Sequence, residues 1–233
     1  MEQHPDDLVP EAVIHDFDAP QKIGYAESKF VSEHVLETFT RSLGLTTAIF
    51  RTGQIAGPLT GKGVWNGREW FPSIMSSSKH LDILPETLGK MESIEWIPVD
   101  VLSSIMVELV EEVLRSQSLG KTLVYNLVNP KPATWSSLSK AAQKLTGISK
   151  TVPLKDWVEA LEVSSHEKNG AIIETNPAVK LLDWLRLISQ KDIPHEGTSG
   201  FEVCRLVQDS RTASQLTAVS SEWMSLWISR WKL

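Results

Sequence analysis

The sequence has very little cysteine and no long apolar run. Its only cysteine is Cys204, so the 233-residue chain has no second thiol for an internal disulfide. A lone cysteine is typical of a packed or surface residue rather than of a nucleophile. No apolar stretch reaches the roughly 20 residues of a membrane-spanning helix, and the first residues lack the basic and apolar regions of a signal peptide. These absences predict a cytoplasmic protein that does not act at a membrane.

Basic residues are missing from the first 20 positions, which contain six acidic residues. The rest of the chain is balanced, because its remaining acidic residues equal the 23 lysines and arginines in number. A chain with no excess of basic residues offers no face for phosphates, so the sequence excludes nucleic acid as a partner. Pro5, Pro10 and Pro20 lie among the acids. We therefore expect residues 1–20 to form an acidic, extended or partly disordered lead-in.

The sequence also lacks a pattern of histidines and cysteines at the spacing of metal ligands. The histidines have no cysteine neighbours and do not follow the spacings of zinc ligands, so the sequence predicts no metal site. The six are His4, His15, His34, His80, His166 and His195.

Tyrosine is also scarce, and one of the two tyrosines, Tyr25, lies four residues before Lys29. Residues 23–43 carry apolar residues at near-helical spacing and are followed by Gly44, which predicts a helix that ends there. Helical positions four apart lie one above the other on a single face. An ammonium group beside a phenol favours the phenolate, so the two side chains form a usable acid–base pair. The same spacing is also common on exposed helix faces, where the lysine only contacts water.

Five stretches together resemble one family. Residues 24–29 read GYAESK, residues 47–51 read TAIFR, and residues 52–57 form the turn TGQIAG. Residues 65–70 read WNGREW, and residues 96–100 read WIPVD. This combination is similar to the extended short-chain dehydrogenase/reductase superfamily. Within it, the sequence most resembles the terminal thioester reductase domains of nonribosomal peptide synthetases, carboxylic acid reductases and aminoadipate reductases.

The resemblance implies a chemistry and a set of site residues. In that family a tyrosine donates a proton to the substrate carbonyl while NADPH delivers hydride, and a lysine assists both. Tyr25 and Lys29 match these catalytic positions. The substrate is an acyl chain held as a thioester on a carrier protein. Arg51, Gly53 and Gln54 match the turn near the nicotinamide. This turn follows a predicted strand, and α/β proteins bind ligands at that end of their strands.

Four further residues are candidates for contact with the substrate. Thr52 and Ile55 lie in the same turn, and Trp65 and Trp70 follow a loop rich in proline and glycine. The two tryptophans are suited to lining a groove for an acyl chain or a pantetheine arm. A hydrophobic plug against the sheet is an equally good interpretation of the same two residues.

The sequence departs from the family before Tyr25. The family begins with a strand and a Gly-x-x-Gly-x-x-Gly turn whose amides hold the dinucleotide pyrophosphate, and this sequence has no such turn. We therefore expect the chain to be the second half of such a reductase, a truncated form. By itself it would bind no cofactor, and NADPH would require a separate dinucleotide-binding half.

Three functions remain open from the sequence. The first is cofactor-independent acid–base chemistry in natural-product biosynthesis, such as a cyclisation, isomerisation or dehydration, with Tyr25 and Lys29 as the catalytic pair. The second is an NADPH-dependent reductase of carrier-bound thioesters that uses a separate dinucleotide-binding half. The third is a non-catalytic module that binds a carrier protein or an acyl chain.

The expected fold is α/β, with a truncated Rossmann-like parallel sheet of about three strands and a helical C-terminal part that binds substrate. Residues 21–130 would form the remnant of the reductase core and residues 131–233 the helical part. The predicted strands are 45–50, 94–99 and 122–128. Asp100, Thr134, Asn176 and Asp209 are the expected N-caps of the helices that follow them, and Gly147 is expected to end the helix that Thr134 begins. A truncated sheet exposes the edge of strand 45–50, which predicts self-association or a partner chain that covers it.

Overall fold

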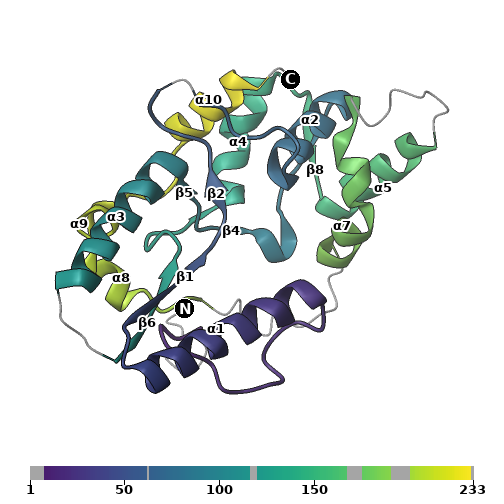
Figure 1. Cartoon of the computed structure of the whole chain (residues 1–233). Helices are drawn as coiled ribbons and strands as arrows, with labels where there is room; N and C mark the ends of the chain where they lie inside the picture. The colour runs from purple at the N-terminus through teal and green to yellow at the C-terminus, as the bar shows by residue number, and fades with distance from the viewer. Residues whose placement is uncertain (1–7, 62, 116–119, 167–174, 190–199, 232–233) are drawn as a thin grey trace. The chain divides into compact units, whose positions relative to one another are not determined.

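A computed structural model gives the fold and describes residues 8–61, 63–115, 120–166, 175–189 and 200–231 (Figure 1). The chain forms two compact units, each assembled from separate segments. The first comprises Met1–Ile55, Val101–Pro130 and Gly197–Leu216, and the second comprises Ala56–Asp100, Lys131–Glu196 and Thr217–Leu233. The short strand β2 (Ile55–Ala56) crosses the point where the chain passes from one unit to the other.

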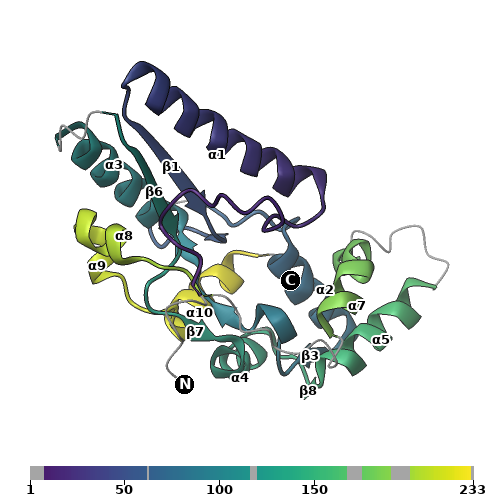
Figure 2. The same ribbon diagram turned by 90° about the horizontal axis from the view of Figure 1, so that it is seen from below.

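The first unit is built around two parallel strands. β1 (Thr47–Thr52) pairs with β6 (Thr122–Leu127), with Thr47 opposite Thr122 and Thr52 opposite Leu127. The strands lie between helix α1 (Gly24–Leu43) on one side and helix α3 (Val99–Arg115) on the other (Figure 2). Two short helices, α8 (Cys204–Asp209) and α9 (Arg211–Gln215), complete the unit. Apolar side chains from β1, β6, α3 and α8 are buried between these elements.

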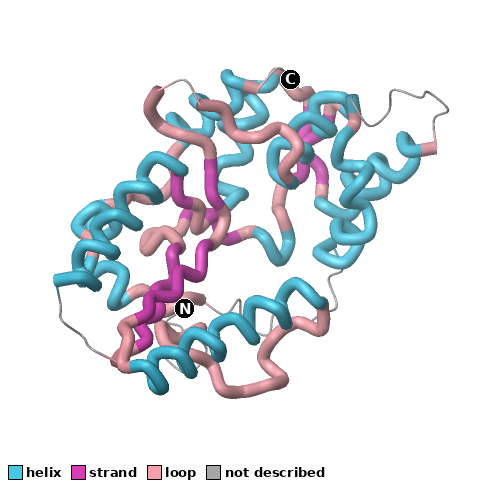
Figure 3. Tube along the Cα trace, in the orientation of Figure 1, coloured by secondary structure: helices cyan, strands magenta, loops and turns pink. Residues whose placement is uncertain are grey.

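The segment before α1 is fastened to this unit as a loop. Residues 10–20 contain no helix or strand, and Val9 forms an isolated parallel bridge with Phe201 (Figure 3). The side chain of Glu11 is only 4% exposed. Its carboxylate accepts hydrogen bonds from the backbone N–H groups of Arg205 and Leu206, at 2.5 and 3.1 Å, in the first turn of α8. The described part of the expected lead-in, residues 8–20, is therefore a loop with a turn at residues 17–18 and a buried contact at Glu11; residues 1–7 lie outside the described residues.

The second unit is mainly helical. Its strands are short: β3 (Ile83–Pro85) pairs with β8 (Lys150–Val152) in parallel, and β4 (Ser93–Ile94) pairs with β7 (Ala133–Thr134) antiparallel. β5 (Ile97–Pro98) is the remaining strand. The helices are α2 (Trp70–Leu81), η2 (Gly89–Met91), α4 (Trp135–Thr146), α5 (Leu154–Ser165), η3 (Pro177–Leu181), α7 (Leu182–Ser189) and α10 (Ser221–Arg230).

Tryptophan dominates the core of the second unit. Trp65 is 4% exposed, and its ring contacts those of Phe71, Trp96, Trp227 and Trp231. Trp227 of α10 and Trp231, which follows it, are thus core residues, and Trp223 is partly buried against them.

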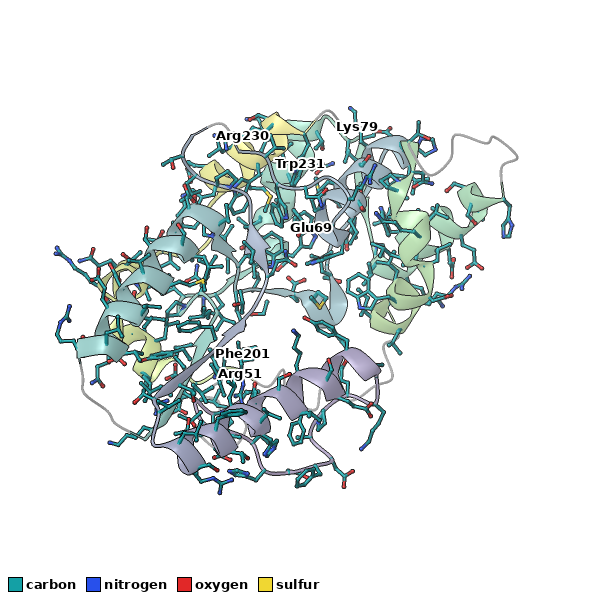
Figure 4. All side chains as sticks on the ribbon, viewed as in Figure 1. Arg51, Glu69, Lys79, Phe201, Arg230 and Trp231 are labelled. Carbon is teal, nitrogen blue, oxygen red and sulfur yellow. The ribbon has the colours of Figure 1, made fainter. Side chains whose placement is uncertain are left out.

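The loop that carries Trp65 is held by charged side chains. The Asp100 carboxylate accepts from the backbone N–H groups of Leu59 and Thr60 and from the Thr60 hydroxyl. The Arg230 guanidinium donates to the backbone carbonyls of Pro58, Gly61 and Gly63 (Figure 4). Burial raises the pKa of Asp100, but the hydrogen bonds from Thr60 and Leu59 outweigh it, so the net pKa is below its usual value.

The α/β class is confirmed, and so are several helix ends. The Thr134 side chain accepts from the Ser137 N–H, and Gly44 and Gly147 end their helices in the left-handed region, with φ of 65° and 68°. The expected single sheet is instead a set of strand pairs. The predicted strand 94–99 is divided between β4 and β5, whose second residue, Pro98, has no N–H to donate to a sheet.

Three expected caps were wrong. α3 begins at Val99, so Asp100 lies within its first turn and binds the 59–60 loop instead. Asn176 occupies the N-cap position of η3, but its side chain makes no cap hydrogen bond and its amide nitrogen donates to Ser164 Oγ. Ser210, rather than Asp209, caps α9. A polar residue before a helix is a cap only if no distant partner takes its side chain.

The chain passes from the first unit to the second at residue 130, but each unit also contains segments from the other side of that position. The segment 56–100 packs with the C-terminal helices, while α8 and α9 belong to the first unit. Long-range contacts account for the second placement: Glu108 of α3 accepts hydrogen bonds from Ser210 and Thr212. Of the described helices, none is both long enough and apolar enough to cross a membrane.

Candidate functional site

Tyr25 and Lys29 lie in the first two turns of α1, on the same face. The Lys29 ammonium nitrogen is 5.4 Å from the centre of the Tyr25 ring, within the range of a cation–π contact. Tyr25 is 73% exposed, so its hydroxyl group is accessible from solvent. The pairing expected from the sequence is therefore present in the first unit.

This half of α1 extends past the carboxyl end of β1. α1 and β1 run in opposite directions (Figures 1 and 2), and Arg51, next to the last residue of β1, contacts Glu33. Tyr25 precedes Glu33 by two helical turns, about 12 Å along the axis. The pair thus lies toward the end of the strand at which α/β proteins bind their ligands.

Arg51, expected to contact a cofactor, is engaged within the protein (Figure 4). Its Nε and Nη2 donate to the two carboxylate oxygens of Glu33, at 2.8 and 2.6 Å. Nη1 donates to the carbonyl of Pro10 and Nη2 also donates to that of Ala12, both at 2.9 Å. Both side chains of the ion pair are 16% exposed. Through these hydrogen bonds, Arg51 joins the segment before α1 to β1.

The two residues that follow it in the turn have local contacts. A Cβ added at Gly53 would lie 2.9 Å from Val128 Cγ1, so close packing against Val128 accounts for the glycine. The amide nitrogen of Gln54 donates to the carbonyl of Ile55 at 2.8 Å.

These contacts bear on whether the chain fits a dinucleotide. A pyrophosphate needs several free amides at a helix N-terminus or a free cation. In the described residues, the predicted cofactor contacts Arg51 and Gly53 are used for packing the protein itself. Neither residue is thus available to hold a phosphate, and the turn itself was expected to lie near the nicotinamide rather than the phosphates.

The residues predicted to contact the substrate fall in both units. Thr52 is exposed at the end of β1, and Ile55 is 39% exposed. In the second unit, Trp65 is buried and its Nε1 donates to Glu69 Oε2, which agrees with the hydrophobic-plug interpretation. Trp70 is half-buried, with its ring edge against Phe71, Trp96 and Trp184.

The second tyrosine is a buried structural group. Tyr125 on β6 is 0% exposed and donates its hydroxyl hydrogen to Asp209 Oδ2 at 2.9 Å. Burial raises the pKa of Tyr125 well above its usual value, and the hydrogen bond to Asp209 raises it further. A phenol held neutral in this way is a poor acid, which leaves Tyr25 as the tyrosine available for proton transfer.

Two cavities lie in the first unit, each of about 400 Å³. One is apolar and is formed along α1 by Phe17, Phe30, His34 and Phe39, among others. His34 follows Tyr25 by nine positions, which places it on roughly the opposite face of α1. The other is polar, with Glu11, Tyr125, Arg205 and neighbouring residues in its wall. Tyr25 lines neither of these two cavities, and the sequence had indicated neither of them.

Burial raises the pKa of Glu11, at the wall of the polar cavity, above its usual value, although hydrogen bonds from the α8 amides act in the opposite direction. Glu11 belongs to the acidic run before α1, in which no pattern distinguished it from the solvent-exposed acids.

Comparison with known proteins agrees with the fold. Residues 3–106 match the family described as "Male sterility protein". A carboxylic acid reductase of Neurospora crassa is 36% identical over 229 residues, covering 97% of this chain and 21% of the relative. An adenylate-forming reductase of Heterobasidion annosum is 29% identical over 222 residues, covering 90% of this chain and 19% of the relative. The chain thus spans about a fifth of the length of these relatives.

Among solved structures, the terminal R domain from the myxalamid PKS-NRPS biosynthetic pathway superimposes with a TM-score of 0.67 at 21% identity. The match covers 96% of this chain and 53% of that domain. The chain is thus similar to the male sterility family over residues 3–106 and to these two reductases over most of its length, and its fold resembles that of the terminal R domain.

Proposed function

We propose that this chain performs acid–base chemistry on a carbonyl group in natural-product biosynthesis, with Tyr25 as proton donor and Lys29 as its cationic partner. The observation that carries the proposal is the contact of 5.4 Å between the Lys29 ammonium and the Tyr25 ring. The pair is accessible from solvent and lies toward the carboxyl end of β1, where a substrate has room to approach.

In this reaction the phenol of Tyr25 donates its proton to the carbonyl oxygen of the substrate. The nearby ammonium of Lys29 stabilises the phenolate that remains, which then takes a proton back. In an isomerisation of the keto–enol type, one proton leaves carbon and one reaches oxygen, so no hydride is consumed. A cyclisation or a dehydration likewise moves protons and consumes no hydride. Such assistance contributes about 10²–10⁴-fold to a rate.

The substrate class follows from the family and from the exposure of Tyr25. An exposed phenol outside both described cavities is suited to a substrate that a partner delivers, rather than to a small molecule enclosed in a pocket. We therefore propose an acyl or peptidyl chain tethered to a carrier protein. The relatives named as adenylate-forming reductases and synthase R domains agree with this class.

The second candidate is an NADPH-dependent reductase. It is favoured by the relatives, which are named reductases. It is disfavoured for this chain acting alone, because the predicted cofactor contacts are engaged in protein packing. In this candidate the dinucleotide phosphates would be held by a separate part.

The deciding experiment measures turnover of a carrier-bound β-ketoacyl thioester, with and without NADPH, by liquid chromatography with mass spectrometry, because an isomer has the same mass as its substrate. We expect turnover without NADPH that Tyr25→Phe and Lys29→Gln each reduce at least about 100-fold, within the range of general acid–base catalysis. Lys22→Gln is the matched control, because Lys22 is an exposed lysine whose ammonium pairs with Asp18 at 3.0 Å. Turnover only with NADPH, together with stoichiometric NADPH binding, would establish the reductase instead. Binding of the carrier without any turnover would leave a docking module.

Self-association, expected from the sequence, is part of the same proposal. β1 pairs with β6 in a two-stranded sheet, so its other edge has no strand neighbour among the described residues. On α1, Val31, Val35, Phe39 and Leu43 are between 48% and 59% exposed. We propose that a second copy of the chain covers this apolar face.

A further inference from the structure

Three potential metal ligands meet on the first unit, away from Tyr25 and Lys29. His34 and Glu37 lie three residues apart on α1 and so share a face of the helix. His15 comes from the loop before α1. One ligand atom from each residue lies within 4.8 Å of the other two, and this is the one such group of three in the described part of the chain.

The distances come close to those of a metal centre. Zinc binds histidine nitrogen and carboxylate oxygen at about 2.0–2.2 Å, which separates two ligand atoms by about 3.3 Å in a tetrahedral site. His15 Nε2 is already 3.5 Å from Glu37 Oε1. The remaining contraction is on the order of 1 Å, and His15, with 63% of its side chain exposed on a loop, has room to make it.

The His34 ring is oriented by its surroundings. Its Nε2 is 3.1 Å from the backbone carbonyl of Ile14, which can only accept, so a metal ion at this ring would be bound by Nδ1. Metal-binding histidines commonly donate their second ring nitrogen to a backbone carbonyl in this way, which fixes the tautomer. The rings of Phe17 and Phe30 pack against His34, with centroids at 5.5 and 4.5 Å.

The two oxygens of the Glu37 carboxylate face two different side chains, His15 and Arg41. Oε1 faces His15, and Oε2 lies 3.6 Å from Arg41 Nη2, an ion pair without a hydrogen bond. The Glu37 side chain is 18% exposed, whereas that of Arg41 is 69% exposed. An incoming cation would therefore meet a partly buried carboxylate whose present partner is free to move away.

We propose that His15, His34 and Glu37 bind a divalent transition-metal ion of the Zn²⁺ class, with water in the fourth position. Two imidazoles and one carboxylate suit zinc and its neighbours, whereas calcium and magnesium prefer an all-oxygen set. The ion ties the loop before α1 to the helix. The site lies on roughly the opposite face of α1 from Tyr25, so the metal proposal can be tested independently of the proposed acid–base chemistry.

The test is a calorimetric titration of ZnCl₂ into the full chain, after treatment with a chelator. We expect one ion per chain, and we expect His15→Ala and Glu37→Gln each to weaken binding at least about tenfold. His80→Ala is the matched control, because His80 is an exposed histidine of α2 outside the cluster. His15 is exposed and Glu37→Gln preserves shape, so both variants should fold, as circular dichroism will verify.

A second readout separates coordination from loose association. At a free Zn²⁺ concentration 100 times Kd, the melting temperature should rise by roughly 5–10 °C in the unaltered chain and in His80→Ala. Co²⁺ in place of Zn²⁺ should give the visible absorption of a four-coordinate ion, lost in His15→Ala. The proposal is overturned if the chain binds no Zn²⁺, or if His15→Ala and Glu37→Gln bind it as tightly as His80→Ala.

Discussion

Replacing Arg51 by methionine should sharply destabilise the first unit. The substitution removes two hydrogen bonds to the Glu33 carboxylate and one each to the carbonyls of Pro10 and Ala12. It also leaves the Glu33 charge, 16% exposed, without its cation. Breaking a buried ion pair by removing one partner typically costs about 3–5 kcal/mol. For a chain of this length, that corresponds to a fall of roughly 6–20 °C in melting temperature.

Thermal and urea unfolding, followed by circular dichroism, would measure the effect. Arg115→Met is the matched control, because Arg115 is 69% exposed, its partner Glu112 is 34% exposed, and its change should stay within about 0.5 kcal/mol. Removing both partners, with Glu33→Leu added to Arg51→Met, should recover part of the loss, since no buried charge is then left unpaired. Limited proteolysis should also cut the loop before α1 faster in Arg51→Met.

The result also decides between two roles for Arg51. A residue that only contacts a cofactor can be replaced without loss of stability, and its replacement lowers NADPH affinity. If Arg51→Met melts within about 1 °C of the unaltered chain, the structural role argued here is refuted.

Four further outcomes are expected. Trp65→Ala should cost about 3–5 kcal/mol by urea unfolding, because it empties a site among four aromatic rings; a loss below 1 kcal/mol would contradict the packing. Gly89→Ala should lower the free energy of unfolding by about 2–4 kcal/mol, since Gly89 has φ of 56° and a Cβ would lie 2.4 Å from a backbone carbonyl oxygen. Gly67→Ala is the control and should leave the stability unchanged, because nothing lies within 4 Å of a Cβ there. The pKa of Asp100 is lowered in the fold, so its stabilisation is present above pH 3.8 and lost as the pH falls through the folded pKa. The melting temperature of Asp100→Asn should therefore depend less on pH below 4, and parallel curves would count against this account. Phe39→Glu should reduce the mass measured by light scattering to that of one chain, and a monomeric unaltered chain would dismiss self-association.

Local patterns predicted much of the secondary structure. The helix around Tyr25 and Lys29 was predicted because its apolar spacing and its terminal glycine are local signals, and the cap at Thr134 for the same reason. The strands β1 and β6 were found within two residues of their predicted bounds. The acid–base pair was accessible to sequence reasoning since four residues of helix bring it together.

Contacts between distant segments were decided by the tertiary structure alone. No local pattern says that Asp100 binds the 59–60 loop, or that Arg51 holds Glu33 and two carbonyls of the preceding loop. The same is true of the histidines: scattered in the sequence, two of them meet Glu37 only because the loop before α1 folds back along the helix. Secondary structure depends on neighbours within a few residues, whereas the partner of a charged side chain depends on where the whole chain brings the next charge.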